Sequence, residues 1–157
     1  MMHAYQRRTI EILLVDDNPG DLQLIKEMLA EAKHSNRAHA VRGGRAALMF
    51  LRKQGAYRDV PTPDLVLLDI NMPGMNGLEV IQEIRTDPEL TCLPIIVLTS
   101  SDDERDIRRC YELRANCYVS KPGGLDGLGR IVRSIDEFWL STARLPYCGP
   151  AALRSTD

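Results

Sequence analysis

The stretch EILLVDDNPGD, residues 11–21, decides the fold, because an apolar run ends directly in two adjacent carboxylates, Asp16 and Asp17. The run shows no polar alternation, which is typical of a strand buried on both faces, as in a parallel sheet. Asn18 is a favourable helix N-cap, and Pro19 suits the first helical position after it. The stretch therefore predicts a buried strand, a tight turn and a helix, with two acids at the turn.

The same alternation of strand and helix continues along the chain. The predicted strands are residues 12–15, 38–41, 65–68, 95–98 and 117–120. Apolar residues recur at helical spacing between them. The predicted helices include one that ends near Lys33, one over about 45–54, a charged one over 104–114 and a closing one over about 125–140. Alternating strands and helices predict an α/β fold with a doubly wound, five-stranded parallel sheet.

Two of these helices carry explicit predictions about burial. The apolar side of the closing helix is predicted to consist of Leu125, Leu128, Ile131, Val132, Ile135 and Phe138. In the charged helix, Ile107, Cys110 and Tyr111 have the spacing of core contacts, whereas the remaining residues are predicted to face solvent. Both helices are therefore expected to cover the sheet.

Composition narrows the class of protein. The chain has 157 residues and a formal net charge of -2, which favours one globular domain. No basic region indicates a nucleic-acid partner. No apolar segment has the length of a membrane span or the form of a signal peptide, so we predict a cytoplasmic protein with no membrane contact. The four cysteines form no CxxC pair, which argues against a zinc site or a disulfide framework.

Each buried strand is followed by a polar residue that can take part in chemistry. Asp16 and Asp17 follow the first, Asp69 the third, Thr99 the fourth and Lys121 the fifth. In an open parallel sheet the ligand crevice lies beyond the carboxyl ends of the strands, so these side chains are expected to converge there. An acidic start of a helix is the alternative explanation for the first two acids alone.

Charge repulsion in such a site calls for a cation. Two carboxylates ~4 Å apart repel by roughly 4 kcal/mol at an effective dielectric constant of about 20, and three close pairs by about 10 kcal/mol. Lys121 supplies one positive charge. A divalent ion suits a set of oxygen ligands better, and hard carboxylate sites favour Mg²⁺. Without metal, at least one carboxylate is expected to have a raised pKa.

Four motifs, LLVDDNPGD, LVLLDINMPGMNG, IIVLTSS and YVSKP, resemble the receiver domain of two-component response regulators in order and spacing. The resemblance covers residues 10 to about 138 and implies a flavodoxin-like receiver fold. It also implies a phosphoprotein in which Asp69 accepts a phosphoryl group from a phosphohistidine on a histidine kinase. Asp17, Asp69 and the backbone carbonyl of Asn71 would ligate Mg²⁺, and Asp16 would reach the ion through a water molecule.

The resemblance implies further roles around the aspartyl phosphate. Thr99 and Lys121 would bind the phosphoryl oxygens, and Tyr118 would be the switch aromatic that moves together with Thr99. A cis peptide bond would link Lys121 to Pro122. Arg114 and Cys117 depart from the family pattern, because small glycines are usual there.

Two other functions compete with this interpretation. An aspartyl-phosphate hydrolase would carry a second acid two residues after its nucleophile, but Asn71 occupies that position and cannot act as a general acid. We therefore predict a phosphoacceptor signalling protein rather than an enzyme. A phosphorylation-independent interaction module on the same fold is the second alternative, and it would be expected to lack the acidic cluster or Lys121.

The end of the chain predicts a partner. SIDEFWLSTARLPY, residues 134–147, and FLRKQGAYRDVPTP, residues 50–63, resemble stand-alone regulators that pair with phytochrome-type histidine kinases. We assign residues 8–141 to the receiver domain and 142–157 to a C-terminal extension that is a candidate dimerisation arm. The resemblance implies a homodimer formed by the fourth helix, fifth strand and fifth helix. The alternative is a tail that folds back on its own domain.

Overall fold

The computed structural model describes residues 8–148 and contains one five-stranded sheet. All four strand pairs are parallel, and the spatial order is β2-β1-β3-β4-β5. The strands are β1 (Ile10–Asp16), β2 (Asn36–Arg42), β3 (Leu65–Leu68), β4 (Ile95–Thr99) and β5 (Cys117–Ser120). The strand order reverses between β1 and β3, which creates a topological switch point at their carboxyl ends. The predicted α/β fold is confirmed.

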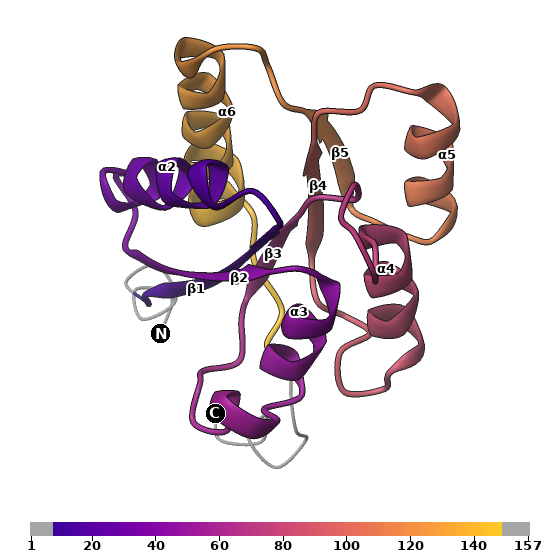
Figure 1. Ribbon diagram of the computed structural model, residues 1–157. Coiled ribbons are helices and arrows are strands. Elements are labelled where there is room, and N and C mark those ends of the chain that lie inside the picture. The colour runs from indigo at the N-terminus through magenta and orange to yellow at the C-terminus, as the bar shows by residue number, and fades with distance from the viewer. Residues whose placement is uncertain (1–7, 149–157) are drawn as a thin grey trace.

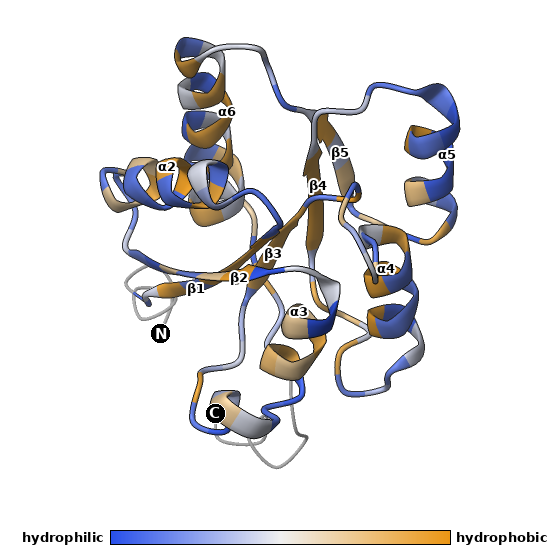
Figure 2. Ribbon diagram, viewed as in Figure 1, coloured by the Kyte–Doolittle hydropathy of each residue, from blue (hydrophilic) through white to orange (hydrophobic). Residues whose placement is uncertain are grey.

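Helices cover both faces of the sheet (Figure 1). One face carries α2 (Pro19–Ala30) and α6 (Leu125–Glu137), and the other carries α3 (Gly44–Leu51), α4 (Gly77–Thr86) and α5 (Glu104–Glu112). Successive strand residues point to opposite faces, so each apolar strand supplies two cores. In β1, Ile12 and Leu14 pack under α2 and α6, while Leu13 and Val15 pack on the opposite side. Figure 2 shows these central strands as the most hydrophobic segments.

The predicted helix ends shift where backbone geometry departs from the apolar pattern. The first helix ends at Ala30 rather than near Lys33. The helix predicted over 45–54 ends at Leu51, because Lys53 and Gly55 both adopt positive φ angles, 54° and 58°. A short 3-10 turn, η1 (Gly55–Tyr57), follows. The closing helix ends at Glu137 and continues as a π-helical turn, η2 (Phe138–Thr142).

Three predicted core residues are exposed instead. In α6, Leu128, Val132 and Ile135 are buried and Ile131 is half-buried, but Leu125 is 65% exposed and Phe138 is 51% exposed. Both exposed residues lie at the ends of the apolar side. In α5, Cys110 is buried and Ile107 is half-buried, whereas Tyr111 is 49% exposed. The Tyr111 hydroxyl accepts a hydrogen bond from the backbone N–H of Tyr118, so its ring lies beside edge strand β5 rather than in the core.

The described part of the C-terminal extension folds across the domain. Leu145 packs with the core under α2 and α6, as Leu140 of the preceding turn does, whereas Cys148 packs with the core under α3, α4 and α5. The Cys148 thiol donates to the carbonyl oxygen of Glu89 at 3.1 Å. The folded-back alternative therefore describes this segment as far as residue 148. The last part of the predicted dimerisation arm, residues 149–157, lies outside the described residues, and the boundary after residue 141 stays a prediction.

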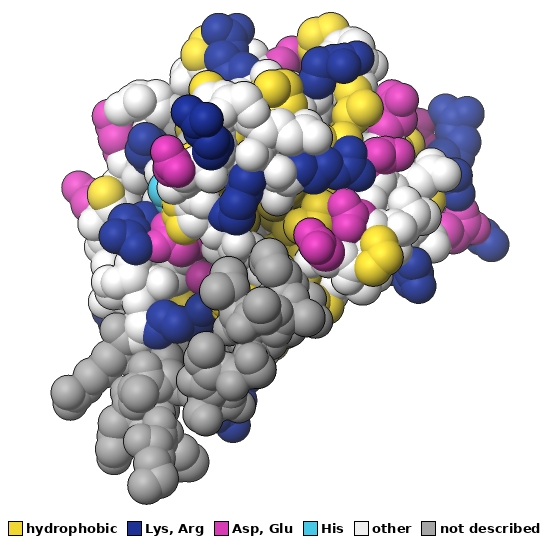
Figure 3. Space-filling model, turned by 90° about the horizontal axis from the view of Figure 1, so that it is seen from below, with side chains coloured by type: hydrophobic (Ala, Val, Ile, Leu, Met, Phe, Trp, Pro, Cys, Tyr) yellow, Lys and Arg dark blue, Asp and Glu magenta, His cyan; other side chains and the backbone are white. Residues whose placement is uncertain are grey.

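Surface and thiol chemistry agree with an ordinary globular domain. The four cysteines are all free thiols. Within residues 8–148 no helix is long and apolar enough to cross a membrane. Figure 3 shows acidic and basic side chains interspersed on one face of the molecule, in keeping with the small net charge. On the face drawn, the charge is thus distributed rather than gathered into one basic field.

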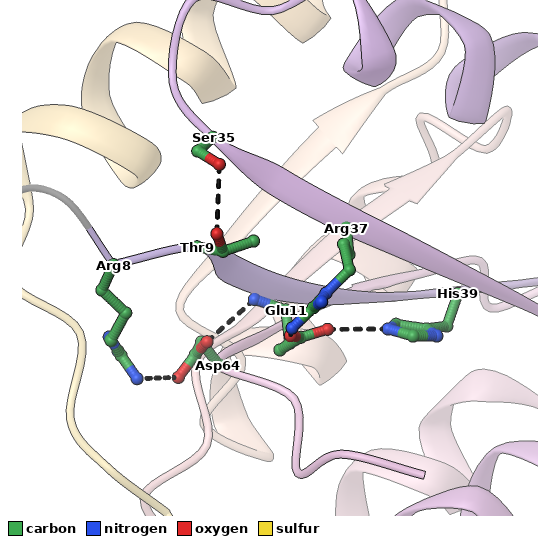
Figure 4. Close-up of polar contacts among 7 residues, drawn as sticks. All are labelled: Arg8, Thr9, Glu11, Ser35, Arg37, His39 and Asp64. Atoms are coloured by element: carbon green, nitrogen blue, oxygen red, sulfur yellow. Dashed lines mark hydrogen bonds and ion pairs between the residues drawn. The ribbon is translucent and has the colours of Figure 1, made fainter.

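A buried polar network joins the amino ends of the central strands to edge strand β2 (Figure 4). The Glu11 carboxylate accepts hydrogen bonds from the Arg37 guanidinium and lies 2.8 Å from Nε2 of His39. Asp64 accepts the backbone N–H of Glu11 at 2.8 Å and pairs with Arg8 at 2.9 Å. Burial alone would raise the pKa of Glu11, but hydrogen bonds from Arg37 and His39 outweigh it and hold that pKa below its usual value.

This network predicts acid sensitivity. Because the folded pKa of Glu11 lies below the unfolded value, its ion pairs stabilise the fold above pH 4.5 and are lost as the pH falls through the lower folded pKa. Glu11→Gln is expected to lower the free energy of unfolding by about 1–3 kcal/mol at pH 7 and to narrow the gap to the native chain in acid. Urea titrations from pH 7 to pH 3 measure both effects, and a pH-independent difference would contradict the expectation.

Candidate functional site

The carboxyl ends of β1 and β3 bring three acids together. Asp16 is the last residue of β1, Asp17 follows it, and Asp69 comes directly after β3. These neighbouring strands are in register, so the three carboxylates each place an oxygen within 4.8 Å of the others. Asp16 and Asp69 are buried, and Asp17 is half-buried. A donor set made only of hard oxygens at this spacing fits Mg²⁺ or Mn²⁺.

The loop after β3 contacts both the side chain and the backbone of Asp69. The backbone N–H of Asn71 donates to Oδ1 of Asp69 at 3.3 Å, so Asn71 lies at the edge of the cluster. The loop turns at Gly74, whose φ is 73°, and then starts α4 through a capping box formed by Asn76 and Glu79. Gly77 packs against the backbone carbonyl of Asp69. The start of α4 therefore fixes where the Asp69 backbone lies.

Lys121 enters the site from β5 but does not pair with Asp69. Its backbone N–H donates to the carbonyl oxygen of Thr99 at 2.6 Å. Its ammonium donates to Oδ2 of Asp16 at 2.5 Å and to Oδ2 of Asp21 at 2.9 Å. Within residues 8–148, these are the two ion pairs that Lys121 makes. The sequence analysis did not identify Asp21 as a partner of Lys121.

The implied cis peptide bond at Lys121–Pro122 is wrong, since the described residues contain no cis peptide. The trans form is the more stable one for an X–Pro bond by about 0.5–1 kcal/mol. The Lys121 ammonium reaches the acids from this trans backbone, so its inward direction does not depend on the isomer.

Thr99 ends β4, and Tyr118 lies in the neighbouring strand β5. Thr99 is fully buried, and within residues 8–148 its hydroxyl makes no hydrogen bond of ordinary geometry, although it lies close enough to Asp69 to lower the pKa of that carboxyl. Tyr118 is half-buried against the core under α3, α4 and α5, and its hydroxyl donates to the carbonyl oxygen of Ser101 at 2.7 Å. The Tyr118 ring is thus tied to the loop that directly follows Thr99.

The titration of Asp69 reflects this crowding. Burial raises the pKa of Asp69, and the Asp16 carboxylate raises it further. The neighbouring Thr99 hydroxyl and the positive charge of Lys121 oppose the shift without cancelling it. Burial alone would lower the pKa of Lys121, but its bonds to Asp16 and Asp21 raise it, so the lysine carries its full charge at neutral pH. One ammonium beside several carboxylates leaves the site anionic. The expected raised carboxylate pKa is confirmed.

Removing one of these charges is expected to stabilise the metal-free protein. Because the folded pKa of Asp69 exceeds the unfolded value of 3.8, stability is lost as the pH rises through the raised folded value. Asp69→Asn is expected to increase the free energy of unfolding by about 1–2 kcal/mol at pH 7 without metal. Urea unfolding in a chelating buffer measures this, with the exposed Asp59→Asn as the matched control. A less stable Asp69→Asn protein would contradict the electrostatic argument.

Comparisons with known proteins show which proteins this chain resembles. Residues 12–133 match the profile of the response regulator receiver domain. Response regulator Rcp1 of Synechocystis is 42% identical over 135 residues, which cover 86% of this chain and 92% of that protein. The crystal structure of the phosphorylated cyanobacterial phytochrome response regulator RcpA has 44% identity and a TM-score of 0.85, and covers 89% of this chain and 100% of its own. The Mn²⁺-bound form of Rcp1 gives 41% identity and a TM-score of 0.83, with 88% and 99% coverage.

Proposed function

We propose, from the premise that this chain belongs to the response regulator receiver domain family, that Asp69 is its phosphoacceptor. The observation that carries the proposal is the juxtaposition of a crowded acidic cluster with the unpartnered, buried hydroxyl of Thr99. The cluster suits a divalent cation, and the buried Thr99 hydroxyl beside Asp69 can donate to an anionic oxygen added there. A phosphoryl group on Asp69, held together with a cation, meets both requirements.

The chemistry needs little beyond positioning and charge neutralisation. An Asp69 oxygen attacks the phosphorus of a phosphohistidine on the kinase, the N–P bond breaks, and the imidazole leaves with its electron pair. As a carboxylate, Asp69 is itself the nucleophile and needs no base to activate it. Asp16, Asp17, Asp69 and the backbone carbonyl of Asn71 would hold Mg²⁺, which supplies charge neutralisation for the transferring oxygens.

The phosphoryl group on Asp69 would act on other proteins through Thr99 and Tyr118. The Thr99 hydroxyl would donate to a phosphoryl oxygen, and the Lys121 ammonium would bind another. A shift of Thr99 would change the loop whose Ser101 carbonyl holds the Tyr118 hydroxyl, and so would reposition the half-buried ring. Signalling would then proceed through altered contacts with other proteins rather than through turnover of a substrate.

Phosphate incorporation from a small-molecule phosphodonor tests the proposal. The native chain is expected to take up one phosphoryl group when Mg²⁺ is present and none in a chelating buffer. Asp69→Asn is expected to remain unlabelled, because an amide is not a nucleophile at this site. Asp59→Asn, which removes an exposed acid, serves as the control and is expected to label normally. Label on Asp69→Asn would place the acceptor elsewhere.

We further propose a phytochrome-type histidine kinase as the partner, acting in the cytoplasm. The support is the likeness to RcpA, which is described as a phytochrome response regulator, over nearly the whole of both chains. Transfer from candidate purified kinases, compared at equal concentrations, tests the pairing. A partner is identified by Asp69-dependent transfer that is faster than from kinases without a phytochrome sensor, and equal rates from both kinds would remove the proposal.

Homodimerisation is proposed for the face formed by α5, β5 and α6. Strand β5 is an edge strand, and Tyr111, Leu125 and Phe138 expose apolar surface around it. A groove of about 540 Å³ runs between β5 and α6 and is lined by Val119, Ile131 and Trp139 among others. A second copy would cover these apolar side chains. A protein that stays monomeric at up to millimolar concentrations, with and without phosphodonor, would contradict the proposed homodimer.

A further inference from the structure

The Lys121 ammonium has a second acidic partner outside the acidic cluster. We propose that Asp21 is a positioning residue that holds this ammonium away from Asp69 in the unphosphorylated protein, and so limits the rate of phosphoryl acceptance. The inference rests on the proposed function, because it concerns the same site. It is carried by the 2.9 Å contact between Nζ of Lys121 and Oδ2 of Asp21.

The packing of the Lys121 side chain restricts the positions that its ammonium can reach. The side chain is only 12% exposed and lines a small apolar gap together with Leu22 and Leu98. A stem that packs along apolar surface moves less freely than an exposed lysine. Its ammonium therefore emerges between β1 and the first turn of α2, where Asp16 and Asp21 lie, and forms no ion pair with Asp69 within the described residues.

The position of Asp21 is fixed by the start of the helix. Asp21 is the third residue of α2, and its backbone N–H donates to Oδ1 of the N-cap Asn18 at 3.2 Å. Its side chain is 37% exposed, so it draws the ammonium toward the solvent side of the site. The helix dipole also favours a carboxylate at this position. The local sequence NPGD thus places a fixed anion beside Lys121.

The two carboxylates that hold Lys121 differ in what happens to them when a cation arrives. Asp16 is one of the three clustered acids and would share its charge with the cation, which weakens its hold on Lys121. Asp21 is not in the cluster and keeps its full charge. An ammonium has three donors, two of which are engaged here. Asp21 therefore remains as the competitor against which a phosphoryl group must attract Lys121.

Phosphorylation of Asp21→Asn by phosphoramidate at saturating Mg²⁺ tests the proposal. Loss of the competing anion is expected to raise the rate of Asp69 phosphorylation about fivefold, the effect of weakening one partly exposed charge-assisted hydrogen bond. The affinity for fluoroberyllate, a non-reacting phosphoryl mimic, is expected to increase by a similar factor. Asp21→Glu, which retains the charge, is expected to restore the native values.

Two controls separate positioning from a general effect on the helix. Asp126→Asn removes an exposed acid from the first turn of α6 that makes no ion pair with Lys121 within the described residues, and it is expected to change neither quantity. In a Lys121→Met background, Asp21→Asn is expected to have no further effect, because the two residues act through one contact. An unchanged or slower rate in Asp21→Asn, or the same gain in the Lys121→Met background, would overturn the inference.

The outcomes also distinguish this inference from the function on which it rests. If the native chain takes up no Asp69-dependent label, both fail together. If the native chain is labelled on Asp69 while Asp21→Asn behaves like the native chain, the phosphoacceptor assignment stands and only the role of Asp21 is lost.

Discussion

Replacing Asp17 by asparagine is expected to weaken Mg²⁺ binding by about 100-fold. Asp17 is one of three carboxylates whose oxygens lie within 4.8 Å of one another, so the substitution removes both a charged ligand and a third of the clustered negative charge. Loss of groups that merely orient metal ligands already lowers metal affinity by about 10–100-fold, and a direct ligand is expected to reach the upper end. Phosphorylation at limiting Mg²⁺ is expected to fall in parallel and to recover at high Mg²⁺.

Calorimetric titration with Mg²⁺ measures the affinity directly. Asp102→Asn is the matched control, because it removes an exposed acid from the loop after β4 that does not belong to the cluster. The control is expected to bind Mg²⁺ within about twofold of the native chain, as expected for a screened surface charge. Equal weakening by both substitutions would show that the cation responds to net charge rather than to these ligands.

Gly77→Ala is expected to destabilise the protein by about 3 kcal/mol and to slow phosphorylation, because there is no room for a methyl group. A Cβ at Gly77 would lie 2.4 Å from the carbonyl oxygen of Asp69 and 2.6 Å from Cα of Ile70. Both are backbone atoms, so the clash cannot be relieved by rotating a side chain. The start of α4 and the backbone of Asp69 have to move apart, which displaces the Asp69 carboxylate from the acids on β1.

Thermal unfolding and the phosphoramidate rate measure the two consequences. Gly123→Ala is the control, since a Cβ there meets nothing within 4 Å and the backbone does not adopt a positive φ. It is expected to unfold within about 0.5 kcal/mol of the native chain. A Gly77→Ala protein with native stability and native phosphorylation would mean that the loop after β3 adapts more easily than its close backbone packing indicates.

The fold was predictable because its signals are local and strong. Each central strand is an uninterrupted apolar run that ends in a polar residue, and Asn18 with Pro19 marks the start of α2. The convergence of Asp16, Asp17 and Asp69 then follows from parallel strands in register. The assignment of roles within that site drew on the family resemblance, and it remains a proposal for each residue.

Features that depend on side-chain paths were not predictable. The bond between Lys121 and Asp21 joins residues 100 positions apart, and its presence depends on where the lysine stem packs. The one signal in the sequence was the position of Asp21, an acid in the first turn of the helix that follows the carboxyl end of β1. Helical periodicity likewise predicted that Leu125 and Phe138 would be buried, but both are exposed. Periodicity identifies the apolar side of a helix and not how far along that side the neighbouring elements reach.

Arg114 departs from the family pattern, and its backbone conformation shows what this departure costs. The sequence has arginine where a small glycine is usual, and the structure gives this residue a φ of 72°. A non-glycine residue in this region is strained by about 1–3 kcal/mol. Its carbonyl oxygen accepts a hydrogen bond from Nε of Arg85, which also binds Asn116 and so holds the turn between α5 and β5. Arg85 thus offsets part of that strain.

The lone hydroxyl of Thr99 makes the resting molecule locally frustrated. Valine has nearly the same shape and would bury no hydroxyl, so a sequence shaped by folding alone would favour it at this position. The threonine is better explained by a bond to an added anionic group. A bound group that accepts a hydrogen bond from this hydroxyl would therefore gain affinity without any rearrangement of the core.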